Sequence, residues 1–156
     1  MVKVSIVMPI YEQEELVVKA INSIPQRDDI EVICIDDCSR DNTYQIVCDL
    51  VKDRKNFRVF RNPRNLGVAF TINRGLDLVT GEYYLQLDCD DYFYTEELNK
   101  VIDMADMDLV FFNMRINDGT VWSTNVMKEM CDHGCLYRRS LIGNIRHPNR
   151  KADGGW

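Results

Sequence analysis

The sequence predicts an α/β domain in which a Rossmann-like, mostly parallel β-sheet is flanked by helices. Two observations predict this fold class. Apolar, β-rich runs alternate with segments whose apolar residues recur at helical spacing, and the gaps between them are short. Repeated β-α-β units of this kind build parallel sheets with helices on both faces. With 156 residues, 46% of them apolar and 28% charged, the chain suits one domain with one core.

The first two predicted strands each lead into a helix. Residues 2–10 are nearly continuously apolar, as a strand buried in a parallel sheet should be. A helix with apolar positions between Leu16 and Ile24 follows, and Pro25 closes it. Residues 30–35 form the second strand. Residues 39–43 are of the helix-capping type, and they precede a helix whose apolar face includes Val47 and Val51.

The next segments continue the alternation. Residues 57–60 predict a third strand, ended by Asn62-Pro63. A third helix has apolar positions from Ala69 to Val79, and Gly81 stops it. Residues 83–87 form the fourth strand.

Beyond the fourth strand the pattern weakens. Thr95 is expected to cap a helix whose first turn holds Glu96 and Glu97, close to the positive helix end. Residues 109–114 predict a fifth strand. The turn residues 117–119 then lead to Val121 and Trp122 in a short C-terminal hairpin. After about residue 125 the sequence predicts no further element.

Polar clusters follow three of the four clearest strands. They are Pro9-Ile10-Tyr11-Glu12, Asp36-Asp37-Cys38-Ser39 and Asp88-Cys89-Asp90-Asp91. Because these strands are expected to run parallel, all three clusters should lie at one edge of the sheet. Ligands of open α/β sheets bind at that edge.

The third cluster is the strongest candidate for a metal site. Asp88, Asp90 and Asp91 repel one another unless a cation neutralises them. Mn²⁺ and Mg²⁺ prefer oxygen ligands and leave positions open for phosphate groups, so an ion here could bridge a diphosphate. The alternative is an acidic loop that caps the next helix and contacts only water.

The first two clusters offer groups that suit a nucleotide. One carboxylate of Asp36-Asp37 could accept hydrogen bonds from a base or ribose while the other braces the loop. The alternative is simple capping of the following helix. Tyr11 could stack on a nucleobase, or it could be a partly buried tyrosine whose hydroxyl meets solvent.

Together these motifs resemble the inverting glycosyltransferases of family 2, which have the GT-A fold. The segments that carry the resemblance are 4–11, 36–43, 65–69 with Asn73-Arg74-Gly75, 81–91 and, on the acceptor side, 136–142. The match is dense from residue 2 to about residue 98. Residues 1–98 would then form the half that binds nucleotide-sugar and metal, and residues 99–156 a shortened acceptor-side half.

The resemblance implies roles for individual residues. The nucleotide, expected to be UDP, would be bound by Pro9, Tyr11, Glu12, Asp37, Asn65, Gly67, Asn73 and Asp88. Asp90 would be the main metal ligand, with Asp91 assisting. The partners would be a nucleotide-sugar donor and a saccharide or lipid-linked acceptor.

An inverting enzyme also needs a general base to deprotonate the acceptor hydroxyl. The resemblance places it in Ala152-Asp153-Gly154-Gly155-Trp156, with Asp153 as the base. The alternative is an acid in a frayed terminus. Ala152 stands where the family often has an acid, Cys38 replaces a common glycine, and Ile72 replaces a common arginine. A catalytically incomplete nucleotide-sugar-binding module, or a truncated remnant of such an enzyme, therefore stays the alternative function.

Several classes of function are disfavoured. The net charge of −6 and the lack of a basic stripe argue against nucleic acid. No G-x-G-x-x-G follows the first strand, which argues against a dinucleotide-dependent oxidoreductase. The acidic, glycine-free first loop argues against a nucleotidyltransferase.

The cellular setting is predicted from cysteines and hydropathy. The six cysteines are expected to be reduced, and the alternative that Cys131, His133 and Cys135 begin a zinc site is disfavoured by the absence of a second ligand pair. No window suits a signal peptide or a membrane span. A cytoplasmic location is expected, with peripheral contact at the inner face of the membrane and homodimer formation left open.

Overall fold

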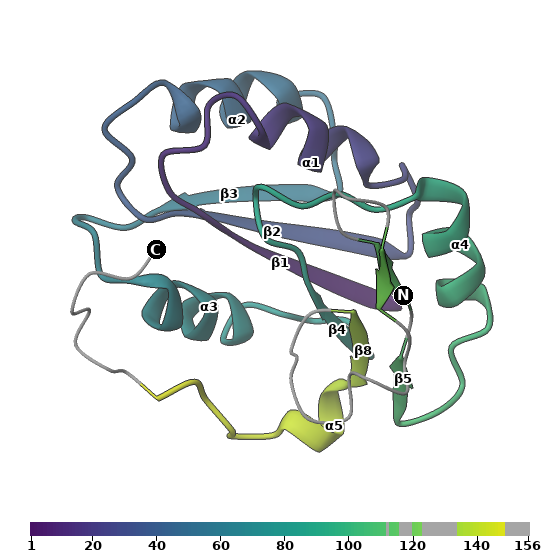
Figure 1. Ribbon diagram of the computed structural model, residues 1–156. Helices are drawn as coiled ribbons and strands as arrows, with labels where there is room; N and C mark the ends of the chain where they lie inside the picture. The colour runs from purple at the N-terminus through teal and green to yellow at the C-terminus, as the bar shows by residue number, and fades with distance from the viewer. Residues whose placement is uncertain (112, 116–119, 123–133, 149–156) are drawn as a thin grey trace.

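The computed structural model describes residues 1–111, 113–115, 120–122 and 134–148, and it confirms the predicted α/β architecture (Figure 1). Its elements are β1 (Val4–Ile10), α1 (Val17–Ser23), β2 (Ile30–Asp36), α2 (Thr43–Val51), β3 (Phe57–Arg61), α3 (Val68–Leu76), β4 (Tyr83–Gln86), α4 (Thr95–Asp103), β5 (Leu109–Phe111), β6 (Met114–Arg115), β7 (Val121–Trp122), β8 (Cys135–Arg138) and α5 (Arg139–Ile142). Within this part of the chain, the main sheet has the order β3-β2-β1-β4-β8-β5.

The sheet is parallel where the sequence predicts it to be. β1 pairs in parallel with β2 and with β4, and β2 pairs in parallel with β3. β8 is antiparallel to both β4 and β5, so the sheet is mixed at that end. The predicted hairpin is present as β6 and β7, which pair antiparallel, and its turn residues 117–119 lie outside the described residues.

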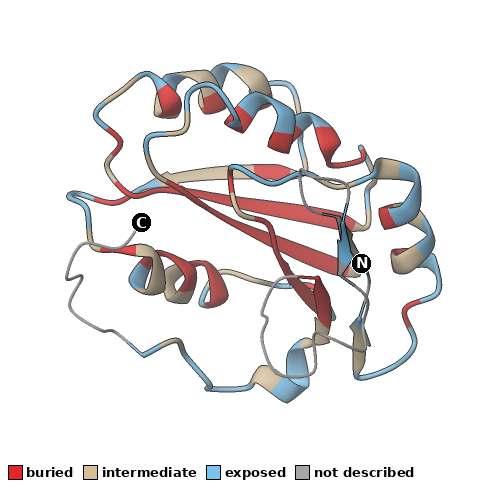
Figure 2. Cartoon of the chain, viewed as in Figure 1, coloured by how far each residue is buried: buried red, intermediate tan, exposed pale blue. Residues whose placement is uncertain are grey.

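The core consists of two apolar layers, one on each face of the sheet. Alternate residues of β1 divide between them: Ile6 and Met8 pack toward α1, α2 and α4, whereas Val7 packs toward α3. Figure 1 shows α1 and α2 above the sheet and α3 below it, and Figure 2 shows β1, β2 and β4 buried between these layers. Full burial of each such side chain stabilises the fold by roughly 1.5–3 kcal/mol.

The structure corrects several predictions of element boundaries. β5 ends at Phe111, and Met114 belongs to β6 instead. α3 ends at Leu76, and Val79 packs against the second core layer from the loop beyond the helix.

The start of α4 also differs from the prediction. Its N-cap residue is Tyr94, and Thr95 is the first helical residue. The Thr95 hydroxyl donates a hydrogen bond to the Ser23 carbonyl oxygen at 2.9 Å, so it ties α4 to the end of α1 instead of capping its own helix. Glu96 and Glu97 lie in the first turn, as predicted.

The described helices include none that is long and apolar enough to cross a membrane. The cysteines of the described residues, Cys34, Cys38, Cys48, Cys89 and Cys135, carry free thiols. Cys131 and His133 lie outside the described residues, and Cys135 is fully buried in β8.

A buried carboxylate joins three strands near the amino-terminal end of β1. Glu31 of β2 accepts hydrogen bonds from the Ser5 hydroxyl at 2.5 Å and from the Thr80 backbone N–H and hydroxyl at 2.5 and 2.8 Å, and it pairs with Arg58 at 3.2 Å. Burial alone would raise the pKa of Glu31, but the hydrogen bonds from Ser5 and Thr80 and the charge of Arg58 lower it below its ordinary value of 4.5.

The variant Glu31→Gln is expected to lose about 2 kcal/mol of stability at pH 7. The amide nitrogen would replace the oxygen that pairs with Arg58, and the loss of charge would weaken the hydrogen bonds that the other oxygen accepts from Ser5 and Thr80. A lowered pKa in the folded state means that the stabilisation is fully present above pH 4.5, the ordinary value, and is lost as the pH falls through the folded-state pKa. Urea unfolding at pH 7 and at decreasing pH should therefore show the difference from the parent shrinking in acid. The exposed Glu15→Gln is the matched control. A difference that is constant with pH would contradict the assignment.

Candidate active site

The site lies where the strand order reverses. β2 and β3 extend the sheet on one side of β1, and β4 lies on its other side. β4 pairs with β1 only from Val4 to Val7, whereas β2 accompanies β1 to Ile10. Pro9, which has no N–H to donate, lies in this last stretch, where β4 no longer pairs with β1. In open α/β sheets, ligands bind at such a reversal, beyond the carboxyl ends of the strands.

The loops that follow β1 and β2 are joined by hydrogen bonds at this edge. The backbone N–H of Glu12 donates to the Ser39 hydroxyl at 3.0 Å, and that of Gln13 donates to the Thr43 hydroxyl at 2.9 Å. Glu12 has a φ of +49°, in the left-handed region. The predicted meeting of the first two clusters is therefore present in the structure.

Asp37 holds the loop between β3 and α3. Its side chain is fully buried. Its carboxylate accepts hydrogen bonds from the Asn62 amide at 2.6 Å and from the backbone N–H groups of Leu66 and Gly67 at 3.0 and 2.8 Å. These contacts fix the backbone beside Asn65, whose side chain is exposed at the same edge. A contact of Asp37 with the base stays a prediction from the resemblance.

Asp36 holds the loop that follows β2 against the end of β3. Its carboxylate pairs with Arg61 at 3.1 Å and accepts a hydrogen bond from the Ser39 N–H at 3.1 Å. The N-terminal N–H of α2 at Thr43 is instead bonded to Asp41, at 3.1 Å. Capping of α2 is therefore not the role of the paired acids at 36 and 37.

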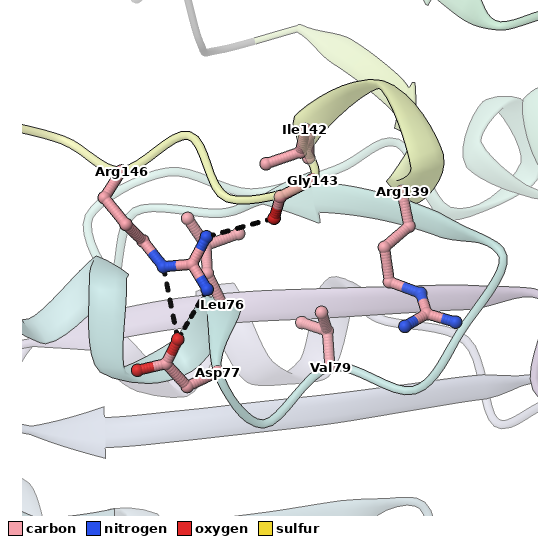
Figure 3. Close-up of a pocket in the computed structure, with 7 residues that line it drawn as sticks. All are labelled: Leu76, Asp77, Val79, Arg139, Ile142, Gly143 and Arg146. Carbon is pink, nitrogen blue, oxygen red and sulfur yellow. Dashed lines mark hydrogen bonds and ion pairs between the residues drawn. The ribbon is translucent and has the colours of Figure 1, made fainter.

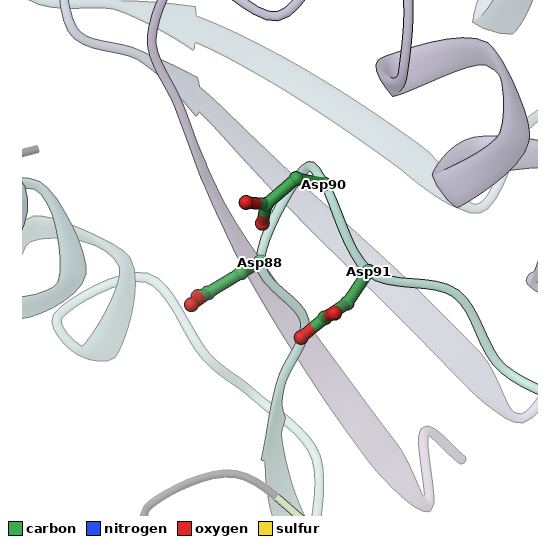
Figure 4. A group of neighbouring side chains, drawn as sticks. All are labelled: Asp88, Asp90 and Asp91. Atoms are coloured by element: carbon green, nitrogen blue, oxygen red, sulfur yellow. The ribbon is translucent and has the colours of Figure 1, made fainter. Parts of the chain in front are cut away.

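The structure brings Asp88, Asp90 and Asp91 together at the end of β4. One carboxylate oxygen from each lies within 4.8 Å of those of the other two, and Figure 4 shows all three side chains reaching to the same side of the turn. Asp88 is half-buried and accepts a hydrogen bond from Gln86 at 2.8 Å, whereas Asp90 and Asp91 are exposed. A set of hard oxygen donors with exposed members fits a hydrated Mn²⁺ or Mg²⁺ ion that also binds phosphate.

Cys89 connects the aspartate loop to the first loop. The backbone N–H of Tyr11 hydrogen-bonds its thiol, and burial raises the thiol pKa to about 12. Cys89 is thus buried between the half-buried Asp88 and the exposed Asp90. Tyr11 is thereby placed next to the candidate metal ligands.

Two predicted site residues are not placed at this cluster by the described contacts. The side-chain amide of Asn73, in α3, bonds the backbone of His147, so its nucleotide role stays a prediction. Asp153 lies outside the described residues.

Sequence reasoning missed Asn62, which is buried and contacts Asp37, Thr71 and Arg74. Its position at the end of the third parallel strand was the available signal, since that end lies at the same edge as the other clusters.

The family model described as "Glycosyl transferase family 2" matches residues 5–151. The chain belongs to glycosyltransferase family 2. The match extends past the densely similar first 98 residues and includes β8 and α5. The mixed sheet is accordingly that of a GT-A glycosyltransferase.

Two relatives of known activity resemble this family 2 chain. It is 29% identical over 150 residues to the poly(ribitol-phosphate) β-N-acetylglucosaminyltransferase TarS of Staphylococcus aureus, covering 91% of this chain and 26% of TarS. It is 35% identical over 108 residues to the GalNAc(5)-diNAcBac-PP-undecaprenol β-1,3-glucosyltransferase of Campylobacter jejuni, covering 67% of this chain and 35% of that enzyme.

Solved structures of TarS share the fold. Its 1–349 fragment superposes with a TM-score of 0.82 at 26% identity, covering 95% of this chain and 51% of the fragment. The same fragment in complex with UDP-GlcNAc gives a TM-score of 0.75 at 27% identity, covering 90% and 46%. The family 2 chain thus spans about half of the solved fragment and a quarter to a third of the two full-length relatives.

The cysteine at position 38, where the family commonly has glycine, leads to a prediction about stability. Cys38 adopts a φ of +65° even though it carries a Cβ. The left-handed conformation costs a non-glycine residue roughly 1–2 kcal/mol, and glycine avoids most of that cost. The variant Cys38→Gly is therefore expected to gain about 0.5–1 kcal/mol of stability after the larger entropy of the unfolded glycine is subtracted. Chemical denaturation measures the gain.

The matched control is Cys38→Ala, which removes the thiol and keeps the Cβ. It should show no gain. A loss of stability in Cys38→Gly of the same size as in Cys38→Ala would mean that packing of the thiol outweighs the backbone conformation.

Proposed function

We propose that this chain transfers a sugar from a UDP-sugar donor to a hydroxyl acceptor with inversion at the anomeric carbon. Residues 1–98 form the donor half and residues 99–156 the acceptor side. The observation that carries the proposal is the convergence of the three carboxylates of Asp88, Asp90 and Asp91 at the reversal point of the sheet. Three acids at one turn are unfavourable unless a cation is part of the site.

The metal ligands of the proposal are Asp90 and Asp91, with Asp88 beside them. When bound, Mn²⁺ or Mg²⁺ supplies positive charge that offsets the charge of the departing diphosphate. Asp88 is held by Gln86, which keeps one of its oxygens oriented. The exposure of Asp90 and Asp91 leaves them accessible to a ligand from solvent.

The nucleotide would lie across the loops of β1, β2 and β3. Tyr11, fixed by its backbone bond to Cys89, offers an aromatic face to the base. Asp37 holds the backbone of Leu66 and Gly67, which would form the floor of the nucleotide site. The exposed residues Asn65 and Glu12 would lie at the rim of that site. Support for UDP as the nucleotide comes from the likeness to the TarS fragment that was solved with UDP-GlcNAc.

The acceptor side of the proposal rests on Asp153 as the general base. The base takes the proton from the acceptor hydroxyl as the oxygen attacks the anomeric carbon and the UDP leaves on the opposite face. The two relatives suggest the acceptor class, because one acts on poly(ribitol-phosphate) and the other on a saccharide carried by PP-undecaprenol. A saccharide or lipid-linked acceptor is therefore proposed.

Calorimetric titration with UDP tests the donor site. Binding is expected in the presence of Mn²⁺ and is expected to be largely lost when a chelator removes it. Titration with ADP under the same conditions controls for unspecific binding of a metal–diphosphate complex. The absence of nucleotide binding with Mn²⁺, Mg²⁺ or Ca²⁺ would overturn the proposal.

The variant Asp153→Asn separates the enzyme from a binding module without turnover. In an enzyme, the variant keeps the UDP affinity and loses transfer and slow donor hydrolysis. The exposed Asp28→Asn, in the loop before β2, serves as a matched control. If the parent chain binds UDP but neither transfers nor hydrolyses UDP-GlcNAc or UDP-glucose, it is the binding module. If Asp153→Asn hydrolyses the donor as fast as the parent, the base is another residue.

A further inference from the structure

A cavity of about 230 Å³ lies between the C-terminal end of α3 and the segment that follows α5. It is remote from the candidate active site. α3 begins after Gly67, which Asp37 holds at the carboxyl edge of the sheet, and it runs away from that edge. A helix rises about 15 Å from Gly67 to Asp77, which borders the cavity. The cavity is therefore separate from the proposed nucleotide site.

The cavity combines an apolar lining with charged side chains. Its apolar side chains pack in the core layer between the sheet and α3, and they are Leu76, Val79 and Ile142. Figure 3 shows the ion pair of Asp77 and Arg146 at one side of the cavity and Arg139 at the other side. Charged groups on an apolar wall suit a ligand that has both a charged and an apolar part.

The guanidinium group of Arg146 is already engaged by the protein. Its Nε and one Nη donate to the same carboxylate oxygen of Asp77 at 3.2 and 2.6 Å. Its other Nη donates to the carbonyl oxygens of Gly143 and Ile145 at 3.2 and 2.8 Å. These contacts balance the charge of Arg146 and hold it as a fixed wall. The cation of the cavity whose charge is not balanced is therefore Arg139, at the opposite side.

Arg139 is held at one end of its guanidinium group and open at the other. Its Nε donates to the carbonyl oxygen of Gly81 at 2.7 Å. In the part of the chain that the structure describes, its two Nη groups have no hydrogen bond and no ion pair with an acidic residue. A guanidinium group is a planar fork that matches two oxygens of a phosphate group. Arg139 thus offers an oriented binding group for phosphate at the side of the cavity.

Two exposed apolar side chains flank the cavity. Leu141 is 51% exposed and Ile145 is 70% exposed, and each directly precedes a residue that lines the cavity. Figure 1 shows α5 and the yellow segment after it below α3, on the side away from α1 and α2. At a membrane surface, apolar side chains enter the acyl region while the charged head of an arginine stays at the depth of the phosphates. The combination therefore indicates a lipid as the molecule that carries the phosphate.

We infer that this cavity binds the phosphate group of a membrane lipid. Arg139 binds the phosphate, and Leu141 and Ile145 enter the bilayer beside it. A terminal phosphate suits the guanidinium fork better than a phosphodiester, because it offers more unesterified oxygens. The net charge of −6 disfavours a general attraction to an anionic surface, so binding depends on the cavity. The inference goes beyond the proposed function and does not rest on it.

Co-sedimentation with lipid vesicles tests the inference in the full chain. Phosphatidylcholine vesicles that contain phosphatidic acid, a lipid with a terminal phosphate, are expected to bind the protein. Vesicles with phosphatidylglycerol, an anionic phosphodiester, at matched surface charge are expected to bind it several-fold more weakly. Arg139→Gln should lower binding to the phosphatidic acid vesicles about fivefold, the effect of one arginine at a membrane surface. Lys55→Gln, at an exposed residue before β3, removes the same charge and should have no effect.

The exposed apolar side chains give an independent test that leaves Arg139 in place. The double variant Leu141→Ser/Ile145→Ser should lower binding to phosphatidic acid vesicles at least 10-fold, because its side chains no longer favour the acyl region. Met107→Ser, at a residue between α4 and β5 that is 66% exposed, is the matched control and should bind as the parent does. These side chains are exposed, so an unchanged melting temperature is expected in each variant.

Calorimetry with pyrophosphate in the absence of metal distinguishes a lipid from a free phosphate compound. If pyrophosphate binds in a manner that depends on Arg139 and no vesicle binds, the cavity takes a soluble phosphate and the membrane assignment is wrong. Equal binding to phosphatidic acid and phosphatidylglycerol vesicles, unchanged in Arg139→Gln, would mean that another surface contacts the membrane. The absence of binding to every vesicle and to pyrophosphate would overturn the inference as a whole.

Titration with UDP and Mn²⁺ separates this inference from the proposed function. Arg139→Gln is expected to keep the UDP affinity of the parent, because the cavity is separate from the nucleotide site. A parent chain that binds phosphatidic acid vesicles and does not bind UDP would overturn the proposed function and leave this inference intact. If Arg139→Gln loses UDP binding to the same extent as vesicle binding, the residue acts through the fold and the inference is wrong.

Discussion

Replacing Asp90 with asparagine is expected to lower sugar transfer about 100-fold and to weaken UDP binding in the presence of Mn²⁺ at least 10-fold. The amide removes one of three carboxylates that lie within 4.8 Å of one another, and with it a negative charge and an anionic ligand for the ion. UDP binding in the absence of a divalent ion should change little, because the effect acts through the ion. Calorimetry with and without Mn²⁺ and a steady-state transfer assay measure these values.

Removing Asp90 should also stabilise the metal-free protein slightly, since it relieves repulsion among the three acids. A small rise in melting temperature in the presence of a chelator therefore accompanies the loss of function. Asp28→Asn, in the loop before β2, removes the same charge and should have no effect on binding or transfer. Mn²⁺-dependent UDP binding as strong in Asp90→Asn as in the parent would exclude this cluster as the metal site.

Replacing Asp37 with asparagine is expected to cost about 3 kcal/mol of stability and to weaken UDP binding roughly 10-fold. The groups around its carboxylate are all donors: the Asn62 amide and the backbone N–H groups of Leu66 and Gly67. An amide nitrogen in place of one oxygen would face these donors and leave buried groups unpaired. Urea unfolding gives the stability, and calorimetry with UDP gives the affinity.

The two readouts for Asp37 distinguish a loop-holding role from direct contact with the base. A loop-holding residue loses stability even when no nucleotide is present. A residue that only contacts the base loses affinity at unchanged stability, and that result would contradict the role derived from the structure. Asp53→Asn, an exposed acid after α2, is the control for the loss of one charge.

The parallel half of the fold could be predicted because its signals are local. Apolar runs such as residues 32–35 and helical spacing such as Val47 to Val51 are set by neighbours in sequence. The meeting of the polar clusters at the candidate site could be predicted for the same reason, because a cluster that follows a parallel strand must lie at the carboxyl edge of the sheet. The convergence of Asp88, Asp90 and Asp91 follows from their shared turn.

The antiparallel end of the sheet could not be predicted in this way. β8 has four residues, and its place is set by pairing with β4 and β5 rather than by an alternation of its own. Threonine is a residue type that often caps helices, but the hydroxyl of Thr95 instead donates its hydrogen bond to the nearby carbonyl oxygen of Ser23. The partner of Asn73 is separated from it by 74 residues, and no local pattern carries such a contact.

The insertion of β8 between β4 and β5 has a consequence for the order in which the protein assembles on the ribosome. β1 to β4 have each other as partners and can associate as soon as residue 86 has emerged. β5 emerges next, but within the described residues its ladder partner is β8, which is synthesised later. Until then the apolar side chains of Leu109 and Val110 have no strand beside them, so the nascent chain carries an unpaired strand that is a natural target for chaperones.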